Sequence, residues 1–117
     1  MKSLIILNDA PYGSERVYNG LRLALSLNKH DPDGEITLFL MADAVASARR
    51  DQKTPAGYYN IEHMLKRFAV GQNRILLCST CMDARGMTDD DLMAAARRSS
   101  MDELSEATLK ADKVLVF

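Results

Sequence analysis

The chain has 117 residues, of which 47% are hydrophobic and 26% are charged, and its formal net charge is −1. A globular composition at this length predicts a single domain over residues 1–117. The balanced charge excludes the basic surface of a nucleic-acid-binding protein, and no apolar run is long enough for a signal peptide or a membrane span. We therefore expect a soluble, cytoplasmic protein with no nucleic-acid and no membrane partner.

The predicted elements come from two patterns. Short runs of β-branched and aliphatic residues indicate buried strands, and apolar stripes at helical spacing with capping residues indicate helices. In chain order they are strand 2–8, helix 14–28 capped by Ser14, strand 35–41, short helix 43–48 capped by Asp43, helix 60–71 capped by Asn60, strand 74–78, helix 88–96 capped by Thr88, helix 100–111 capped by Ser100, and strand 113–117.

Strands and helices alternate through the whole chain, which predicts a three-layer α/β fold with helices on both faces of a mostly parallel sheet. Four strands are predicted directly, and a fifth is expected in residues 82–87 or 98–101. Residues 50–59 are predicted to form an exposed loop. The pairs Arg49-Arg50 and Arg97-Arg98 are interpreted as solvated helix ends. A small sheet in a short chain leaves edges exposed, so we expect an oligomer.

Two cysteines, Cys78 and Cys81, lie where the predicted strand 74–78 ends, and the chain has no others. Open α/β proteins build their sites at this edge of the sheet. A structural disulfide is not expected in a reducing compartment, so the pair is interpreted as catalytic, metal-binding or simply packed. A polar loop, with no apolar helix directly after it, is expected to follow the pair. That context disfavours a thioredoxin-like dithiol.

Three interpretations of the cysteine pair remain open from the residues alone. A nucleophilic thiolate would be stabilised by Arg85, by the hydroxyls of Ser79 and Thr80, and by backbone N–H groups of the turn. Structural zinc is disfavoured because His30 and His63 are isolated, and we expect no metal and no cofactor. In the third interpretation the thiols only pack, but a pair at a strand end favours function.

Three glycine and tyrosine positions are predicted to line the same site. Tyr12 and Gly13 belong to the loop after the first strand, and Gly86 follows the cysteine pair. Gly13 is interpreted first as the glycine of a tight strand-to-helix turn, because neither a P-loop nor a dinucleotide fingerprint is present. Tyr12 is expected to contribute its hydroxyl.

A set of short motifs runs through the whole chain. They are Asn8-x-Ala10-Pro-Tyr-Gly-Ser-Glu15 with Leu21-Arg-Leu-Ala24, Leu38-Phe-Leu-Met-x-Asp43-Ala-Val45, Gly57-x-x-Asn60-Ile61, Cys78-x-Thr80-Cys81-x-Asp83-x-Arg85-Gly86, and Ala111-Asp-Lys-Val-Leu-x-Phe117. Together, and in this order, they resemble the DsrE/DsrF-like family and especially its YchN subgroup. The resemblance implies a compact α/β fold and, as in YchN-like proteins, a homohexamer built as a trimer of dimers.

The resemblance also implies a chemistry. The better understood DsrE-type and TusD-type members act in sulfur relay or sulfur oxidation, and one cysteine in this region accepts sulfane sulfur as a persulfide. Cys78 occupies the matching position, with Arg85 and Gly86 at similar spacing. Those relay subunits carry no second cysteine at the position of Cys81, which is interpreted here as a resolving thiol or a bystander.

The leading hypothesis is a persulfide carrier, a sulfurtransferase-type activity that takes sulfur from a donor protein and passes it to an acceptor protein. The alternative is a non-catalytic oligomeric scaffold or small-ligand-binding protein, in which the cysteines are structural or redox-regulatory.

Overall fold

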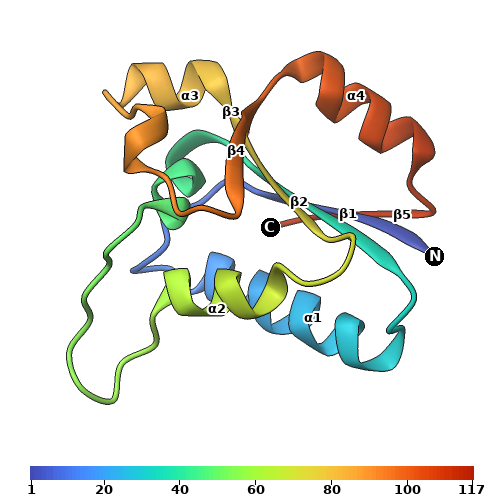
Figure 1. Ribbon diagram of the computed structural model, residues 1–117, viewed down its shortest axis with the longest axis horizontal. Helices are drawn as coiled ribbons and strands as arrows, with labels where there is room; N and C mark the ends of the chain where they lie inside the picture. The colour runs from blue at the N-terminus through green and yellow to red at the C-terminus, as the bar shows by residue number, and fades with distance from the viewer.

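The fold was obtained as a computed structural model that describes residues 1–117 (Figure 1). In chain order its elements are β1 (Lys2–Leu7), α1 (Arg16–His30), β2 (Glu35–Leu40), the 3₁₀ helix η1 (Ala42–Ala48), α2 (Ile61–Phe68), β3 (Arg74–Cys78), α3 (Ser79–Ala84), the 3₁₀ turn η2 (Asp89–Asp91), β4 (Ala96–Ser99), α4 (Met101–Lys110) and β5 (Lys113–Val116).

The five strands form one parallel sheet in the order β4-β3-β2-β1-β5. The four strands predicted from apolar runs are confirmed to within one residue. The fifth is β4, which overlaps the second of the two expected places. The expected α/β class, with a parallel sheet between helices, is confirmed.

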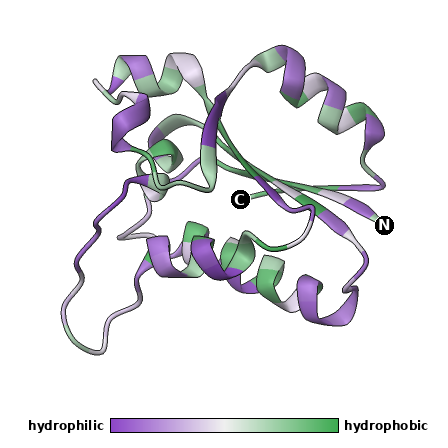
Figure 2. Ribbon diagram, in the orientation of Figure 1, coloured by the Kyte–Doolittle hydropathy of each residue, from purple (hydrophilic) through white to green (hydrophobic).

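Helices α1 and α2 cover one face of the sheet, and α4 covers the other (Figure 1). The larger core lies on the α1 and α2 side, where Ile5, Leu38 and Phe68 are fully buried. The smaller core, under α4, contains Leu4, Phe39, Leu76 and Leu104. Because the central strands are buried on both faces, they are mostly apolar after their first residues, as Figure 2 shows.

Two predicted helix starts are wrong in detail. The N-terminal cap of α1 is Glu15, which has a left-handed backbone with φ of 66°. Ser14 lies one residue earlier, where its hydroxyl donates to Asp9 and accepts the N–H of Arg16 at 3.3 Å. The cap of η1 is Met41, and Asp43 lies in the first turn. The Asn60 cap of α2 is confirmed, because its side chain accepts the N–H of His63 at 3.0 Å.

The predicted helix over residues 88–96 is wrong. The capping box of Thr88 and Asp91 is present, but it starts a single turn of three residues. The N–H of Met93 then donates to the carbonyl of Ala48 at 2.9 Å, and Ala96 begins β4. Pairing with β3 therefore outweighs the helix propensity of the alanines in this segment.

The pair Arg97-Arg98 lies on β4 and not at a helix end, so its interpretation as a solvated helix end is also wrong.

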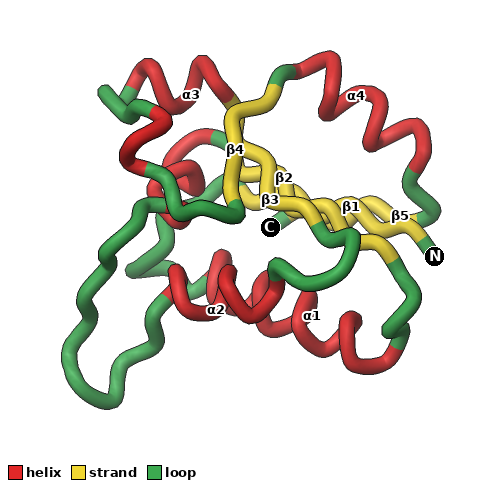
Figure 3. Tube along the Cα trace, in the orientation of Figure 1, coloured by secondary structure: helices red, strands yellow, loops and turns green.

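Residues 50–59 form the predicted loop, which extends away from the body of the molecule (Figure 3). Its base is held by the buried carboxylate of Glu62, which accepts the N–H groups of Asp51 and Gln52 at 3.2 and 2.9 Å. None of the helices has both the length and the apolar character that crossing a membrane requires.

Candidate dithiol site

The two cysteines belong to a strand-to-helix junction at the carboxyl end of the sheet. Cys78 is the last residue of β3 and caps α3, and Cys81 lies in the first turn of that helix. The expectation that a polar loop follows the pair directly is therefore wrong. The six residues of α3 (Ser79–Ala84) have no apolar stripe, so the sequence shows no helical pattern there. They form a helix where the chain turns back at the edge of the sheet.

Polar groups converge on the Cys78 sulfur. The backbone N–H of Cys81 donates to Cys78 Sγ at 3.4 Å, and Thr80 Oγ1 lies 3.3 Å from the same atom. Both cysteines are half-buried and free. Cys78 packs against the smaller core, so its thiol has an apolar side and a side lined with polar hydrogen-bonding groups.

The two thiols have opposite pKa shifts. Burial alone raises the pKa of both sulfurs. For Cys78, hydrogen bonds from the Cys81 thiol, from the Thr80 hydroxyl and from both backbone N–H groups outweigh burial, so its pKa is lowered. For Cys81, burial and the hydrogen bond to Cys78 raise the pKa. The thiolate therefore forms first on Cys78.

Arg85 contacts the second cysteine and not the first. Its guanidinium forms an ion pair with Asp43 at 3.0 Å and donates to the Cys81 carbonyl at 3.0 Å. Its charge lowers the pKa of Cys81, against the larger effect of burial. Arg85 thus ties the end of α3 to η1, while Asp43, predicted as a cap, supplies the matching carboxylate.

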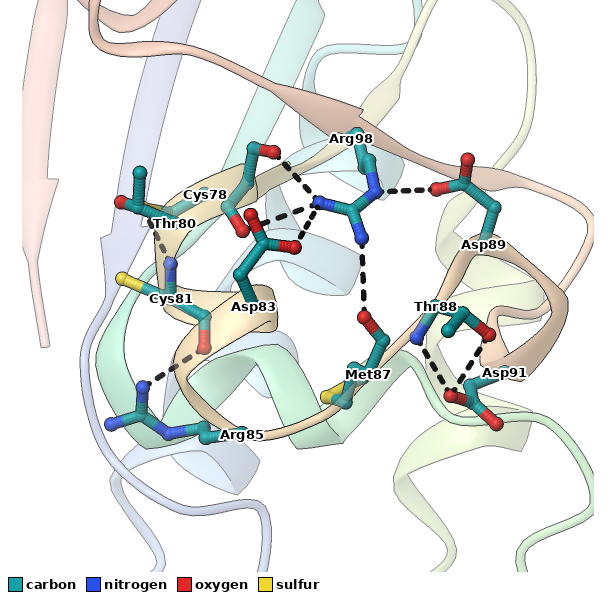
Figure 4. Close-up of polar contacts among 11 residues, drawn as sticks. Cys78, Thr80, Cys81, Asp83, Arg85, Met87, Thr88, Asp89, Asp91 and Arg98 are labelled. Atoms are coloured by element: carbon teal, nitrogen blue, oxygen red, sulfur yellow. Dashed lines mark hydrogen bonds and ion pairs between the residues drawn. The ribbon is translucent and has the colours of Figure 1, made fainter.

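Arg98, on β4, holds the whole junction together (Figure 4). It donates to Ser79 Oγ at 2.7 Å and to Asp83 at 3.0 Å, both on α3. It also donates to Asp89 at 2.7 Å and to the carbonyl of Met87 at 3.1 Å. A planar guanidinium can satisfy this many acceptors at once. The sequence gives no local signal for this role, since the acceptors lie 9 to 19 residues away.

The other predicted site residues lie in different places. Tyr12 makes no hydrogen bond to either cysteine. Its hydroxyl donates to Gln52 at 2.6 Å and accepts the N–H of Ile61 at 3.1 Å, on the α2 side of the sheet. Gly13 and Gly86 have φ of 118° and 64° with open space around them, so they serve the backbone path of their loops.

A model of the DsrE/DsrF-like family matches residues 1–117. The chain belongs to the DsrE/DsrF-like family. It is 42% identical to protein YchN of Escherichia coli (strain K12) over 116 residues, which are 99% of this chain and 98% of that protein. The crystal structure of the E. coli ychN protein has a TM-score of 0.94 and covers 100% of this chain and 99% of that one.

A more distant relative also matches. It is named a TusC homolog, from Vibrio parahaemolyticus (serotype O3:K6), and is 27% identical over 115 residues, which are 96% of this chain and 95% of that protein. This DsrE/DsrF-like chain is thus similar to YchN in both sequence and fold. The similarity extends across the strand, the helix and the loops that build the dithiol site.

The reactive side chains at this site are its two thiols. No group of three or more histidine, cysteine, aspartate or glutamate side chains lies together in a way that would hold a metal ion. Its reactive groups are a half-buried thiol with a lowered pKa and a second thiol three residues later. Such a pair can attack a sulfur electrophile and can then close to a disulfide.

Proposed function

We propose that the protein is a sulfur carrier that accepts sulfane sulfur as a persulfide on Cys78. The observation that carries the proposal is the convergence of donors from Thr80 and Cys81 on one half-buried sulfur. Membership in a family that includes sulfur-relay proteins supports the same chemistry, as does the relative named a TusC homolog. A sulfur-donor protein and a sulfur-acceptor protein are the partners that this function requires.

In the proposed transfer, the Cys78 thiolate attacks the outer sulfur of a donor persulfide, R–S–SH. A bond forms between Cys78 Sγ and that sulfur, and the bond to the donor sulfur breaks. The products are Cys78–S–SH and the donor thiolate R–S⁻, so no electrons are gained or lost overall. The thiolate fraction of Cys78 helps to set the rate, which is why its lowered pKa favours the reaction at neutral pH.

Cys81 is proposed as a resolving thiol. As a thiolate it attacks Cys78 Sγ in the persulfide, which forms a Cys78–Cys81 disulfide and releases HS⁻. Its raised pKa makes this second step slower than loading. The persulfide would therefore persist long enough for an acceptor to reach it.

Mass spectrometry after incubation with a small persulfide donor tests this function. Wild type and Cys81→Ser are expected to gain the mass of one sulfur atom, which a reductant removes, and Cys81→Ser is expected to keep it longer. Cys78→Ser, the matched variant, is expected to gain none. Absence of added sulfur on both wild type and Cys81→Ser would contradict the carrier function. Uptake by Cys78→Ser would show that Cys78 is not the acceptor.

The alternative is a scaffold or ligand-binding protein with packed cysteines. Cys78 does pack against the core under α4, and this contact is the observation that favours the alternative. It predicts that alkylating both thiols leaves assembly and binding unchanged, and that Cys78 reacts no faster with iodoacetamide than an ordinary thiol. The rate of that alkylation at neutral pH discriminates between the two functions.

We also propose that the protein assembles with copies of itself, as a hexamer built as a trimer of dimers. Large apolar side chains remain exposed on α4 and on the edge strand β5: Leu109 at 87%, Val116 at 64%, Met101 at 60% and Val114 at 41%. A single helix covers this side of the sheet (Figure 1). Exposed apolar groups gathered in this way support an interface.

A further inference from the structure

A groove runs along the seam between α1 and α2, on the opposite face of the sheet from α4. Its volume is about 490 Å³. Side chains one turn apart on each helix form its walls, namely Tyr18, Arg22 and Leu25 from α1 and Asn60, His63, Met64 and Arg67 from α2 and its cap. Tyr58 and Tyr59 complete the lining.

The charge in this groove has one sign. Its lining contains two arginines and a histidine but no aspartate or glutamate. Arg67 makes no ion pair and no side-chain hydrogen bond. Arg22 makes no ion pair either; it donates to the Asn19 side chain at 3.2 Å and lies 5.6 Å from the centre of the Tyr18 ring.

Unpaired arginines are the exception in this protein. Six of its nine arginines form ion pairs with carboxylates, namely Arg49, Arg50, Arg74, Arg85, Arg97 and Arg98. Two of the remaining three line this one groove. Glu15 is near enough to Tyr59 for its negative charge to raise the pKa of the Tyr59 hydroxyl, but Glu15 does not line the groove. The groove therefore offers two guanidinium groups to an anion from outside.

The aromatic residues gather at the same place. All four tyrosines of the chain stack in one cluster, in which Tyr59 has its ring centre 4.2 Å from that of Tyr18 and 4.5 Å from that of Tyr58. Tyr58 is at the open end and is 49% exposed, so another ring can extend the stack.

We propose that this groove binds a small anionic ligand that carries an aromatic ring, such as a mononucleotide or an aryl phosphate. The ring stacks on Tyr58, and the phosphate or carboxylate group binds Arg22 and Arg67. The site is separate from the persulfide chemistry, because neither cysteine lines the groove and none of the lining side chains hydrogen-bonds to Cys78 or Cys81.

Isothermal titration calorimetry on the full-length protein tests the site, with adenosine monophosphate and phenyl phosphate as probes and with adenosine and inorganic phosphate as their halves. At least one probe is expected to bind, and each half at least about tenfold more weakly, because one of the two contacts is missing. Arg22→Gln and Arg67→Gln are each expected to weaken binding about tenfold. The matched control is Arg16→Gln, an unpaired arginine at the start of α1 and outside the groove; it and Cys78→Ser are expected to leave affinity unchanged.

Three results would overturn the proposal. The first is no binding of either probe at millimolar concentration. The second is equal binding of inorganic phosphate and the two probes, which would mean a non-specific cationic surface. The third is a change of oligomeric state in Arg22→Gln or Arg67→Gln by gel filtration, which would make the groove an interface between copies of the chain.

Discussion

Cys78 and Cys81 are three residues apart and equally free, yet their environments differ in one decisive respect. Cys78 caps α3 and receives hydrogen bonds, whereas Cys81 lies inside the helix and gives one. The donated hydrogen bond stabilises the thiolate of Cys78 at the expense of the thiolate of Cys81. Two cysteines separated by two residues thus become a pair with a leading nucleophile and a slower second thiol.

This division of roles predicts the effect of removing the donor. In Cys81→Ala the pKa of Cys78 is expected to rise, because the thiol that donates to its sulfur is gone. In Cys81→Ser the rise is expected to be smaller, because a hydroxyl can still donate. The rate of iodoacetamide alkylation of the Cys78 peptide against pH measures both values. An unchanged pKa in Cys81→Ala would mean that Thr80 and the backbone alone stabilise the thiolate.

At the scale of elements, the start of α4 holds the edge strand β4 in place. The Glu103 carboxylate accepts hydrogen bonds from the Arg97 guanidinium at 2.5 and 3.0 Å and from the Ser99 hydroxyl. These contacts, Arg97 first, lower the pKa of Glu103 to about 2. Short edge strands have few backbone hydrogen bonds of their own, so an ion pair from a neighbouring helix adds to their stability.

The lowered pKa of Glu103 makes part of the stability pH-dependent. The contribution is complete above the pKa of the unfolded chain, about 4.3, and is lost as the pH falls toward about 2. Glu103→Gln is expected to lower the free energy of unfolding by about 1–2 kcal/mol at pH 7, after allowance for solvent screening. The difference from wild type is expected to shrink toward zero near pH 2.

Urea unfolding of both proteins at several pH values measures this difference. Glu106→Gln is the control, because Glu106 is exposed and bonds only Lys110. A destabilisation by Glu103→Gln that stays constant from pH 7 to the lowest pH would contradict the proposed ion pair.

At the scale of the whole molecule, the two faces of the sheet are covered unequally. The α1 and α2 side holds a core of 22 buried residues, whereas the α4 side holds one of 4. β5 lies at one edge of the sheet with both of its α4-side valines, Val114 and Val116, exposed. The exposed valines are therefore available to the partner copy that we propose for this side.

Light scattering coupled to gel filtration tests the assembly. The protein is expected to elute with a multiple of its 13.0 kDa chain mass, six times for the proposed hexamer. Val116→Lys with Leu109→Lys is expected to shift it toward one chain, because a buried charge at an interface is costly. Val70→Lys is the matched control, since Val70 is 55% exposed but belongs to the connection after α2. A wild-type mass of one chain would contradict the assembly.

Most of the sheet was predictable, because β1, β2, β3 and β5 each contain a short run of aliphatic residues that is typical of a buried strand. β4 was expected only as one of two alternative places, since Ala96-Arg97-Arg98-Ser99 has no apolar alternation and is extended because it pairs with β3. For the same reason α3 was missed: six residues without a stripe become helical at the sheet edge. Short elements are defined by their neighbours more than by their own composition.

By itself the sequence determined the α/β class, the parallel sheet and the position of a cysteine pair at the carboxyl end of β3, because hydrophobic periodicity and strand order follow from local pattern and chain geometry. Only the tertiary structure decided which groups surround each thiol: donors from Thr80 and Cys81 at Cys78, Arg85 with Asp43 at the end of α3, and Arg98 across from β4. It also shows that Tyr12 lies on the α2 side of the sheet and that the four tyrosines cluster beside two unpaired arginines. Contacts of this kind join residues far apart in the chain, so they exist only once the sheet and its two helical layers have packed.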